Sequence, residues 1–405
     1  MSDLHIGLIG SGGRGGYLGQ LAHRPGKGAR VVACCDLMPA TLAKNRTDYG
    51  RSLFMTRNYR DLLRRELDAV IIATPDYLHE KQAVAALARG LAVYLEKPMA
   101  ITIAGCDRIL RAAAKTKARL YVGHNMRHMP FVKKMKSLID DGAIGKVKAC
   151  WVRHFVGNGG DYYFRDWHAE RRFSHGLLLQ KAAHDIDVVH WLCGGFTREV
   201  SAMGTLAVYG DVGRRLPATN APRKLAPPLV RPDMWPPAAQ REFNHQIDVE
   251  DLSQMLMKLD NGVLATYAQC HFTPDYWRNY TVIGSAGRLE NFGDGGRGTR
   301  VRLWNRRSTG YKAAGDATFT FPVARGGHGG ADLRIIGEFL RFARDGGPTE
   351  TSPLAARESV ATGYTATESL RSGGRLLRVP QPPSENCRSN WERTSARKAV
   401  FSARK

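Results

Sequence analysis

The sequence predicts an α/β N-terminal domain with a parallel sheet and an α+β C-terminal domain with a large, mainly antiparallel open sheet. Residues 1–124 alternate short apolar runs with segments of helical length, which is typical of a doubly wound parallel sheet. In residues 125–380 several apolar runs follow one another, some joined by tight turns such as Asp260-Asn261-Gly262. The chain of 405 residues is long enough for two hydrophobic cores.

Five strands and four helices are expected in the first domain. The strands are short apolar runs, as buried parallel strands require, and cover His5–Ile9, Arg30–Cys35, Leu67–Ala73, Leu91–Leu95 and Leu120–Val122. The helices lie between them and cover Gly15–Arg24, Pro39–Tyr49, Glu80–Arg89 and Ile103–Lys117.

The second domain is expected to be richer in strands. Its strands cover Lys146–Val156, Glu199–Val208, Leu252–Leu259, Gly262–His271, Tyr280–Gly284, Gly287–Phe292 and Arg300–Trp304. Its helices cover Pro130–Asp141, Leu177–Leu192, Asp332–Arg344 and Pro353–Arg371. Seven prolines between Gly213 and Gln246 predict an irregular excursion over residues 213–246. Residues 381–405 are polar and basic and are expected to form a disordered tail.

Composition limits the classes of partner and compartment. The net charge is +23, but the basic residues are dispersed and accompany no nucleic-acid motif, so attraction of anionic small ligands is the expected consequence. No apolar run approaches the roughly 20 residues that a membrane helix needs. The chain shows no leader peptide, and its seven cysteines have no CxxC spacing. We therefore expect a cytoplasmic protein with reduced thiols, no metal site, and no membrane or nucleic-acid partner.

A glycine-rich turn follows the first strand. Gly10-Ser11-Gly12-Gly13-Arg14-Gly15 fits the pattern G-x-G-x-x-G, in which the glycines allow a tight turn, close approach to a pyrophosphate and close helix packing. The second strand ends at Asp36, twenty-one positions after Gly15, where an acid would bind a ribose hydroxyl. The combination predicts a Rossmann dinucleotide-binding domain. An acid at Asp36 repels a 2′-phosphate, which favours NAD over NADP, although Arg14 could reach such a phosphate.

The tripeptide Glu96-Lys97-Pro98 follows the fourth strand. A lysine held at a strand end beside a nicotinamide is partly desolvated, so it is expected to exchange a proton more easily than a surface lysine. That pairing of a proton carrier with a hydride acceptor suits the interconversion of alcohols and carbonyls.

Several motifs in order make the chain similar to a known family. They are GSGGRG at 10–15, TPDYLH at 74–79, EKPMA at 96–100, HDID at 184–187, IGSAGRLE at 283–290 and SPLAARESVATGYTATESL at 352–370. With them, residues 4–380 resemble the Gfo/Idh/MocA oxidoreductases, which act mostly on sugars, cyclitols and related polyols. The resemblance implies nicotinamide contacts at Thr74, Pro75 and His79, a catalytic Lys97, and a Glu96 that helps to hold the cofactor ribose.

The second half of the site is expected on the helix that begins near Gly176. Family dehydrogenases resemble G-x-L-x-D-x-G-x-H-x-x-D, and here His184 and Asp187 match while Gln180 replaces the aspartate and Lys181 is added. Gln180 cannot accept a proton, so His184 is the remaining acid/base. Lys181 lies about 100° from Gln180 around a helix, and we leave open whether it reaches the ligand or is structural.

Polyol substrates need several hydrogen-bonding partners and an apolar stacking surface. A group of this type follows the first domain: Asn125, Arg127, Tyr162, Tyr163, Arg165, Asp166, Trp167 and His168. The aromatic members could form a sugar platform or a buried cluster. Arg127 matches a recurring family arginine, and His328 in a glycine-rich loop is a further candidate substrate contact.

Three functions are compatible with these residues. The first is an NAD-dependent oxidoreductase of a sugar, amino sugar or cyclitol, with Lys97 moving the hydroxyl proton and His184 assisting. The second is an enzyme that uses bound NAD transiently to cleave a glycoside by oxidation, elimination and reduction, which the change at Gln180 and Lys181 keeps open. The third is a non-catalytic dinucleotide-sensing regulator. A homo-oligomer is expected because an open sheet has a face to cover, and the family resemblance implies a dimer or tetramer.

Overall fold

The chain divides into two compact units, which are described separately. A computed structural model describes residues 2–157, 160–213, 215–218, 235–323 and 326–383. Unit 1 comprises Met1–His128, Gly330–Val360 and Gln381–Lys405, and unit 2 comprises Met129–Gly329 and Ala361–Pro380. The expected tail from 384 onward, and residues 214 and 219–234 of the proline-rich excursion, lie outside the described residues.

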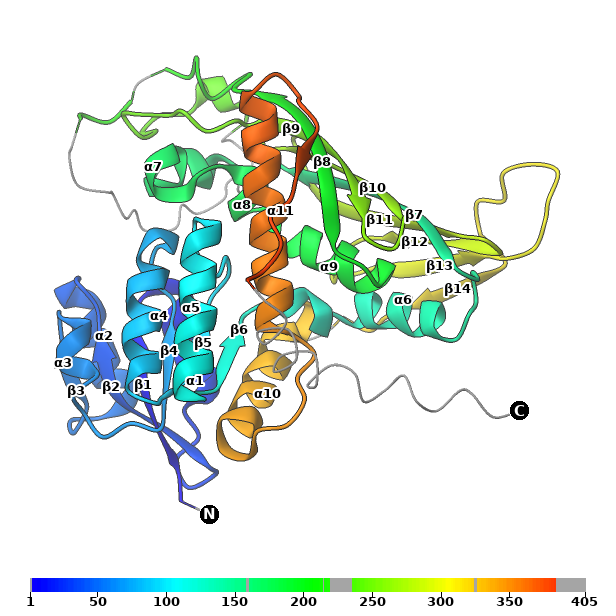
Figure 1. The fold of residues 1–405 in the computed structure, drawn as a ribbon. Helices are drawn as coiled ribbons and strands as arrows, with labels where there is room; N and C mark the ends of the chain where they lie inside the picture. The colour runs from blue at the N-terminus through cyan, green and yellow to red at the C-terminus, as the bar shows by residue number, and fades with distance from the viewer. Residues whose placement is uncertain (1, 158–159, 214, 219–234, 324–325, 384–405) are drawn as a thin grey trace, which may run out of the picture. The chain divides into compact units, whose positions relative to one another are not determined.

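Unit 1 is built on six parallel strands in the order β3-β2-β1-β4-β5-β6 (Figure 1). They are β1 (Leu4–Ile9), β2 (Ala29–Cys35), β3 (Phe54–Thr56), β4 (Ala69–Ile72), β5 (Ala92–Leu95) and β6 (Leu120–Val122). The strand order reverses between β1 and β4. In open α/β sheets ligands bind beyond the carboxyl ends of the strands at such a point.

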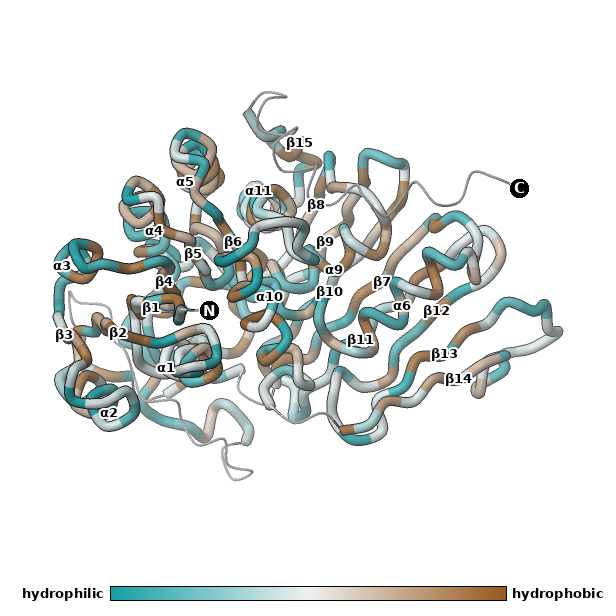
Figure 2. Tube along the Cα trace, turned by 90° about the horizontal axis from the view of Figure 1, so that it is seen from below, coloured by the Kyte–Doolittle hydropathy of each residue, from teal (hydrophilic) through white to brown (hydrophobic). Residues whose placement is uncertain are grey.

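Helices cover both faces of this sheet. They are α1 (Gly13–Ala22), α2 (Pro39–Tyr49), α3 (Tyr59–Leu62), α4 (His79–Ala88), α5 (Ile103–Thr116) and α10 (Ala331–Asp345). Helices α4 and α5 lie side by side on one face, while α1 and α10 lie on the other (Figures 1 and 2). The prediction that residues 330–360 belong to the second domain is therefore wrong. The apolar stripe of α10, with Ile335, Ile336 and Phe339, completes the core around Ile6, Leu8 and Tyr94.

Unit 2 contains a nine-stranded sheet in the order β14-β13-β12-β11-β7-β10-β9-β8-β15. The strands are β7 (Val147–Val156), β8 (Thr197–Thr205), β9 (Leu252–Leu259), β10 (Leu264–Cys270), β11 (Tyr276–Gly284), β12 (Gly287–Phe292), β13 (Arg300–Trp304), β14 (Ala317–Thr320) and β15 (Leu377–Arg378). Every neighbouring pair is antiparallel except β7 and β10, so the predicted mainly antiparallel sheet is confirmed. Hydrophobic and hydrophilic residues alternate along β13, as expected for a sheet with two different faces (Figure 2).

Unit 2 also contains several helices, at least two of which contact the sheet, at β7 and β13. They include α6 (Pro130–Asp140), α7 (Arg171–Ser174), α8 (Leu177–Gln180) and α9 (Ala183–Cys193), together with the second half of α11 (Pro353–Arg371). The single helix expected over Leu177–Leu192 is interrupted after Gln180, where the amide groups of Lys181 and Ala182 both donate to the carbonyl of Leu177. None of the helices among the described residues is long and apolar enough to cross a bilayer.

Candidate active site

The glycine-rich turn has the conformation that its sequence predicts. Gly10 has φ +80°, a left-handed conformation that favours glycine, and a Cβ on Gly15 would lie 1.8 Å from the carbonyl oxygen of Gly10. The two glycines therefore allow α1 to start directly against the end of β1. Gly13, with φ +39°, has open space where its Cβ would be.

The start of α1 suits a pyrophosphate. Its first turn carries no acidic residue, and Gly12 at the N-cap has no side chain to occupy the free N–H groups. Asp36 lies beside this turn, where its carboxylate accepts hydrogen bonds from the amides of Gly12 and Met38 at 3.0 Å each. The loop and the helix end thus offer N–H donors for a pyrophosphate and Asp36 offers an acceptor for a ribose hydroxyl, so the residues fit the predicted cofactor.

Arg14 points away from Asp36 and joins two other acids. Its Nε lies 2.8 Å from Glu96 Oε1, and its Nη2 lies 2.8 Å from Oδ1 of Asp332 on α10. Burial alone would raise the pKa of Glu96, but the adjacent guanidinium outweighs this effect and holds the pKa below its usual value. Arg14 was expected to be able to reach a 2′-phosphate, but its side chain is already ion-paired with Glu96 and Asp332.

Lys97 is placed by the residues on either side of it. Its backbone amide donates to Glu96 Oε2 at 3.2 Å, and the peptide to Pro98 is cis. His79 is fully buried, with its ring between the carbonyl oxygens of Pro98 at 2.8 Å and Thr74 at 2.9 Å. His79 thus ties the loop after β4 to the Glu96-Lys97-Pro98 turn, and both of its ring nitrogens are used in doing so.

Two residues expected at the substrate lie in the 3-10 turn Asn125–His128 of unit 1. Asn125 donates to Asp332 Oδ1 at 3.0 Å, and its own Oδ1 is a buried acceptor that no described residue satisfies. Arg127 donates to the backbone carbonyl of Glu350 at 2.9 Å and is also buried. Asn125 therefore has a vacant hydrogen-bonding position next to the Arg14 cluster.

In unit 2 the structure brings His184 and His328 together. Their ring centres lie 6.4 Å apart, and His184 is buried near the start of α9 while His328 is exposed. Gln180 is buried at the end of α8, one turn before His184. Lys181 lies in the break between α8 and α9, with right-handed backbone angles, three residues before His184.

The sequence left open whether the aromatic residues between Tyr162 and His168 form a sugar platform or a buried cluster. Trp167 and His168 are buried and stack at a ring-centre distance of 3.6 Å, with Asp166 bonded to the His168 ring, which suits the buried cluster that the sequence left open beside the sugar platform. Arg165 is likewise held by Asp161 and Gln240. Tyr163 is half-buried, and its ring lies 5.3 Å from the ammonium group of Lys181. Of this group, Tyr163 is the better placed to meet a ligand.

A buried polar network that the sequence did not reveal lies behind Lys181. Asp185 accepts hydrogen bonds from Tyr267 at 3.2 Å and from Tyr280, is bonded to His154 at 3.1 Å, and forms an ion pair with Arg278 at 2.7 Å. Burial would raise the pKa of Asp185, but Arg278 and His154 outweigh it and the pKa falls well below its usual value. Burial together with Arg278 lowers the pKa of His154 to about 3, so this imidazole is neutral at physiological pH. The network therefore pairs one carboxylate with one guanidinium.

Comparison with known sequences now identifies the chain. A profile described as an oxidoreductase family with an NAD-binding Rossmann fold matches residues 4–124, and the corresponding Gfo/Idh/MocA C-terminal domain matches residues 132–290. The chain belongs to the Gfo/Idh/MocA family. It is an NAD-binding oxidoreductase, and the resemblance predicted from its motifs is confirmed.

Individual relatives differ in their named reactions. The protein YteT of Bacillus subtilis, named as an oxidoreductase, is 28% identical over 313 residues, which is 69% of this chain and 73% of that protein. The 2,7-anhydro-N-acetylneuraminate hydratase of Mediterraneibacter gnavus is 32% identical over 206 residues, 50% of this chain and 53% of that protein. An inositol 2-dehydrogenase of Salmonella typhimurium is 30% identical over 189 residues, 46% and 52% of the two chains. The matches therefore span about half the length of the latter two relatives.

The fold of the family extends over nearly the whole chain. A levoglucosan dehydrogenase in complex with NADH and levoglucosan is 20% identical, with a TM-score of 0.72, and covers 94% of this chain and all of its own. At that identity the likeness establishes the fold alone.

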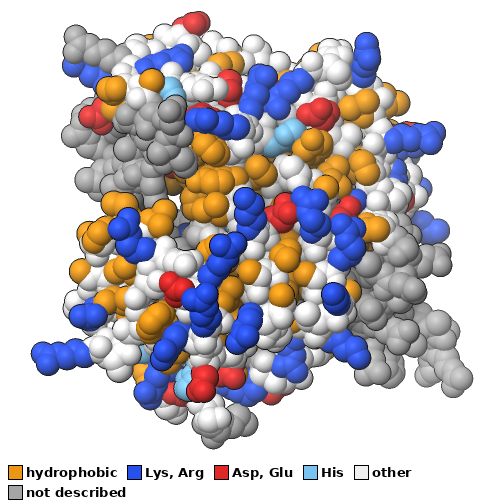
Figure 3. All heavy atoms as spheres, turned by 60° about the vertical axis from the view of Figure 1, so that its left-hand side comes forward, with side chains coloured by type: hydrophobic (Ala, Val, Ile, Leu, Met, Phe, Trp, Pro, Cys, Tyr) orange, Lys and Arg blue, Asp and Glu red, His pale blue; other side chains and the backbone are white. Residues whose placement is uncertain are grey.

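The surface of this Gfo/Idh/MocA protein carries its charge as the sequence predicts. Lys and Arg side chains are spread over the displayed face among neutral and hydrophobic ones, with fewer acids between them (Figure 3).

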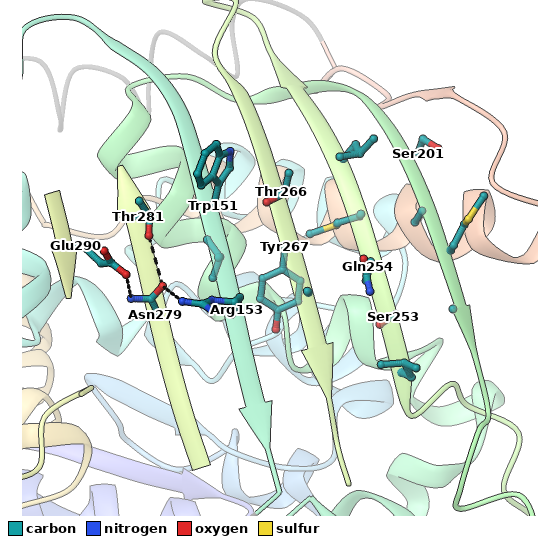
Figure 4. Close-up of a pocket in the computed structure, with 18 of the residues that line it drawn as sticks. Trp151, Arg153, Ser201, Ser253, Gln254, Thr266, Tyr267, Asn279, Thr281 and Glu290 are labelled. Atoms are coloured by element: carbon teal, nitrogen blue, oxygen red, sulfur yellow. Dashed lines mark hydrogen bonds between the residues drawn. The ribbon is translucent and has the colours of Figure 1, made fainter. Parts of the chain in front are cut away.

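The nine-stranded sheet also has an exposed apolar face. A groove of about 1150 Å³ lies on it, lined by residues of β7 to β12 and by Tyr311. Figure 4 shows Trp151 on β7, Thr266 on the neighbouring β10 and Ser201 on β8, with β9 between the last two strands. Trp151 is 52% exposed and Leu256 is 62% exposed.

Proposed function

We propose that the protein is an NAD-dependent oxidoreductase that interconverts a hydroxyl and a carbonyl group of a sugar, amino sugar or cyclitol. The observation that carries this proposal is the Glu96-Lys97 turn at the end of β5, anchored by Arg14 to the glycine-rich loop. It sits in an NAD-binding domain, and the family relatives include an inositol dehydrogenase.

Lys97 is the proton carrier in this proposal. Bound NAD supplies a nicotinamide that accepts or returns the hydride. Lys97 Nζ accepts the hydroxyl proton during oxidation and donates it back during reduction. Glu96 stays ionised beside Arg14 and holds the Lys97 amide through Oε2, so its role is to fix the lysine backbone. A positioned acid/base of this kind contributes about 10²–10⁴-fold in rate.

His184 is the second acid/base, and Gln180 binds a hydroxyl without taking its proton. A glutamine amide both donates and accepts hydrogen bonds, whereas it has no ionisable proton. Further substrate contacts are proposed at Asn125, Arg127, Tyr163, Lys181 and His328. Asn125 is supported by its vacant buried acceptor, and His328 by its proximity to His184.

NAD rather than NADP is the proposed cofactor. The Asp36 carboxylate lies beside the phosphate-binding turn and would repel a 2′-phosphate. Arg14, the one cation within the loop motif, is paired with Glu96 and Asp332.

A second function is supported by the hydratase relative and by the Gln180-Lys181 change. In it, oxidation of a sugar hydroxyl acidifies the neighbouring C–H, elimination breaks a C–O bond, and the hydride returns to the sugar. This reaction predicts cleavage of a glycoside without accumulation of NADH and with solvent deuterium in the product. A product without deuterium would exclude it.

The direct test is absorbance at 340 nm with NAD⁺ and a panel of sugars, amino sugars and cyclitols. Accumulation of NADH with at least one substrate supports the assignment as an oxidoreductase with net oxidation of its substrate. Glycoside cleavage with deuterium uptake and no NADH would favour the second function instead.

A homo-oligomer is proposed from the apolar sheet face. The groove lined by Trp151, Met203, Leu256 and Tyr311 exposes large hydrophobic side chains of the kind that mark protein interfaces. A second copy of the chain would cover this face.

A further inference from the structure

Lys181 has an unusual environment for a lysine. Its Nζ lies 5.3 Å from the ring centre of Tyr163 and 5.7 Å from that of Tyr276. Within the described part of the chain, no carboxylate lies within the 4.0 Å of an ion pair with this ammonium group. Its contacts are therefore two aromatic faces rather than an acid.

The acids of the neighbourhood are already engaged. Arg278 binds Asp185 at 2.7 Å and Asp294 at 3.4 Å. The two imidazoles nearby, His154 and His271, are kept neutral by burial, which lowers the pKa of each. Burial also lowers the pKa of Lys181, because the charged amine lacks a contacting counter-ion. A negatively charged group of a ligand could therefore form the ion pair that Lys181 does not make with these residues.

The shape of this environment favours one kind of anion. Two tyrosine rings offer flat surfaces for the apolar face of a sugar ring, and one ammonium group balances one negative charge. A phosphate carries nearly two charges and is usually bound by several cationic donors, but Arg278 is occupied by two carboxylates. A carboxylate is the better match for Lys181.

The lysine is also close in the chain to a residue where a substrate is expected. Lys181 lies in the break between α8 and α9, three residues before His184, and Tyr163, a further candidate substrate contact, lies 5.3 Å from its ammonium group.

We propose that Lys181, between the rings of Tyr163 and Tyr276, binds a carboxylate of the substrate, so that the enzyme acts on a sugar acid rather than on a neutral sugar or cyclitol. This inference rests on the proposed function, since it names the substrate class of the same site. The carboxylate stays unchanged in the reaction; its ion pair with Lys181 orients the ring that is oxidised.

Binding to the NADH-loaded protein tests the inference without turnover. Calorimetric titrations compare D-galacturonate with D-galactose, D-glucuronate with D-glucose, and D-glucose 6-phosphate with D-glucose. They are repeated on Lys181→Met, on Lys181→Arg, which keeps the charge, and on Lys148→Met, which removes an exposed charge in the same unit. We expect at least one uronate to bind about 10- to 100-fold more tightly than its neutral partner in the wild type. That preference is lost in Lys181→Met, largely kept in Lys181→Arg, and unchanged in Lys148→Met.

Equal affinity for acids and neutral sugars, a preference that survives Lys181→Met, or a stronger preference for the phosphate would each overturn the inference. So would a Lys181→Met enzyme that keeps its uronate affinity and KM but loses kcat, because Lys181 would then act on a proton. The proposed function fails separately: a protein that binds uronates through Lys181 yet forms no NADH with any substrate refutes the oxidoreductase and not the carboxylate site.

Discussion

Replacing Arg14 by methionine should lower the free energy of unfolding, because Arg14 forms ion pairs with the buried Glu96 and Asp332. The guanidinium pairs with a Glu96 side chain that is 9% exposed and an Asp332 side chain that is 1% exposed, while Arg14 itself remains 27% exposed. Each pair is worth about 4 kcal/mol at an effective dielectric constant of 20. Desolvation offsets much of that attraction, so the expected loss in unfolding free energy is about 3 kcal/mol, at the lower end for breaking a buried pair.

The loss should depend on pH in a defined direction. In the wild type the lowered pKa of Glu96 adds stability above the unfolded pKa of about 4.3, and this stability is lost as the pH falls through the folded pKa. Without Arg14, burial raises the folded pKa of Glu96 above the unfolded value. The variant then loses stability as the pH rises from about 4.3 towards its folded pKa, so the gap to the wild type widens towards neutral pH.

Urea unfolding at several pH values measures this gap, using the transition that added NADH shifts to higher urea. Arg46→Met removes an exposed arginine from α2 and serves as the control. Adding Glu96→Gln and Asp332→Asn to the Arg14 variant should recover most of the loss, because no buried charge is then left unpaired. A loss below about 1 kcal/mol at neutral pH, or a gap that stays constant between pH 5 and 7.5, would refute the reasoning.

Four further outcomes are expected. Asp36→Ser should narrow the preference for NAD⁺ over NADP⁺ by about tenfold or more in fluorescence titrations, and an unchanged ratio would show that Asp36 does not face the 2′ position. Arg278→Met leaves Asp185 buried without its guanidinium and should cost about 3–5 kcal/mol of unfolding free energy. Because the pKa of Asp185 is lowered in the folded wild type, that stability is present above about pH 4 and is lost on acidification. The unfolding free energies of the two proteins should therefore converge at low pH. His184→Asn should lower kcat by about 10²-fold with little change in thermal stability, and full activity would remove His184 from the proton path. Trp151→Lys should reduce the mass measured by light scattering if the sheet face is the interface, and an unchanged oligomer would place the interface elsewhere.

Most helices and strands could be predicted from patterns within short stretches of the sequence. Pro39–Tyr49, Leu252–Leu259 and Leu120–Val122 have the bounds that were predicted, because a segment of helical length, an alternating run and a fully apolar run are each set off by flanking turns. Short elements such as β3, β14 and β15 were missed, since two to four residues carry too little periodicity to distinguish a strand from a loop.

Features set by distant partners could not be predicted in the same way. The apolar stripe of α10 shows that the helix packs, but not that it packs on the first sheet around Ile6 and Tyr94. The start of β11 was missed because Arg278 interrupts the apolar pattern expected of a strand. Its charge is balanced by Asp185, which lies on a helix distant in the sequence. The motif of Gln180 and His184 pointed to the substrate helix, whereas the aromatic contacts of Lys181 depend on Tyr276 and required the structure.

The same limit applies to His79 and Arg14. Their positions in the motifs predict cofactor contacts, and the structure adds for each a set of protein partners that holds the Glu96-Lys97-Pro98 turn. A motif thus locates a residue at a site without specifying which atoms of that site it touches.

The central claim is that Lys97 carries the proton in NAD-dependent oxidation, and steady-state kinetics of Lys97→Met on the best substrate of the 340 nm panel test it most directly. We expect kcat to fall by about 10²–10⁴-fold while NAD⁺ still binds, with the exposed-site control Lys148→Met unaffected. A Lys97→Met enzyme that retains full turnover would contradict the claim.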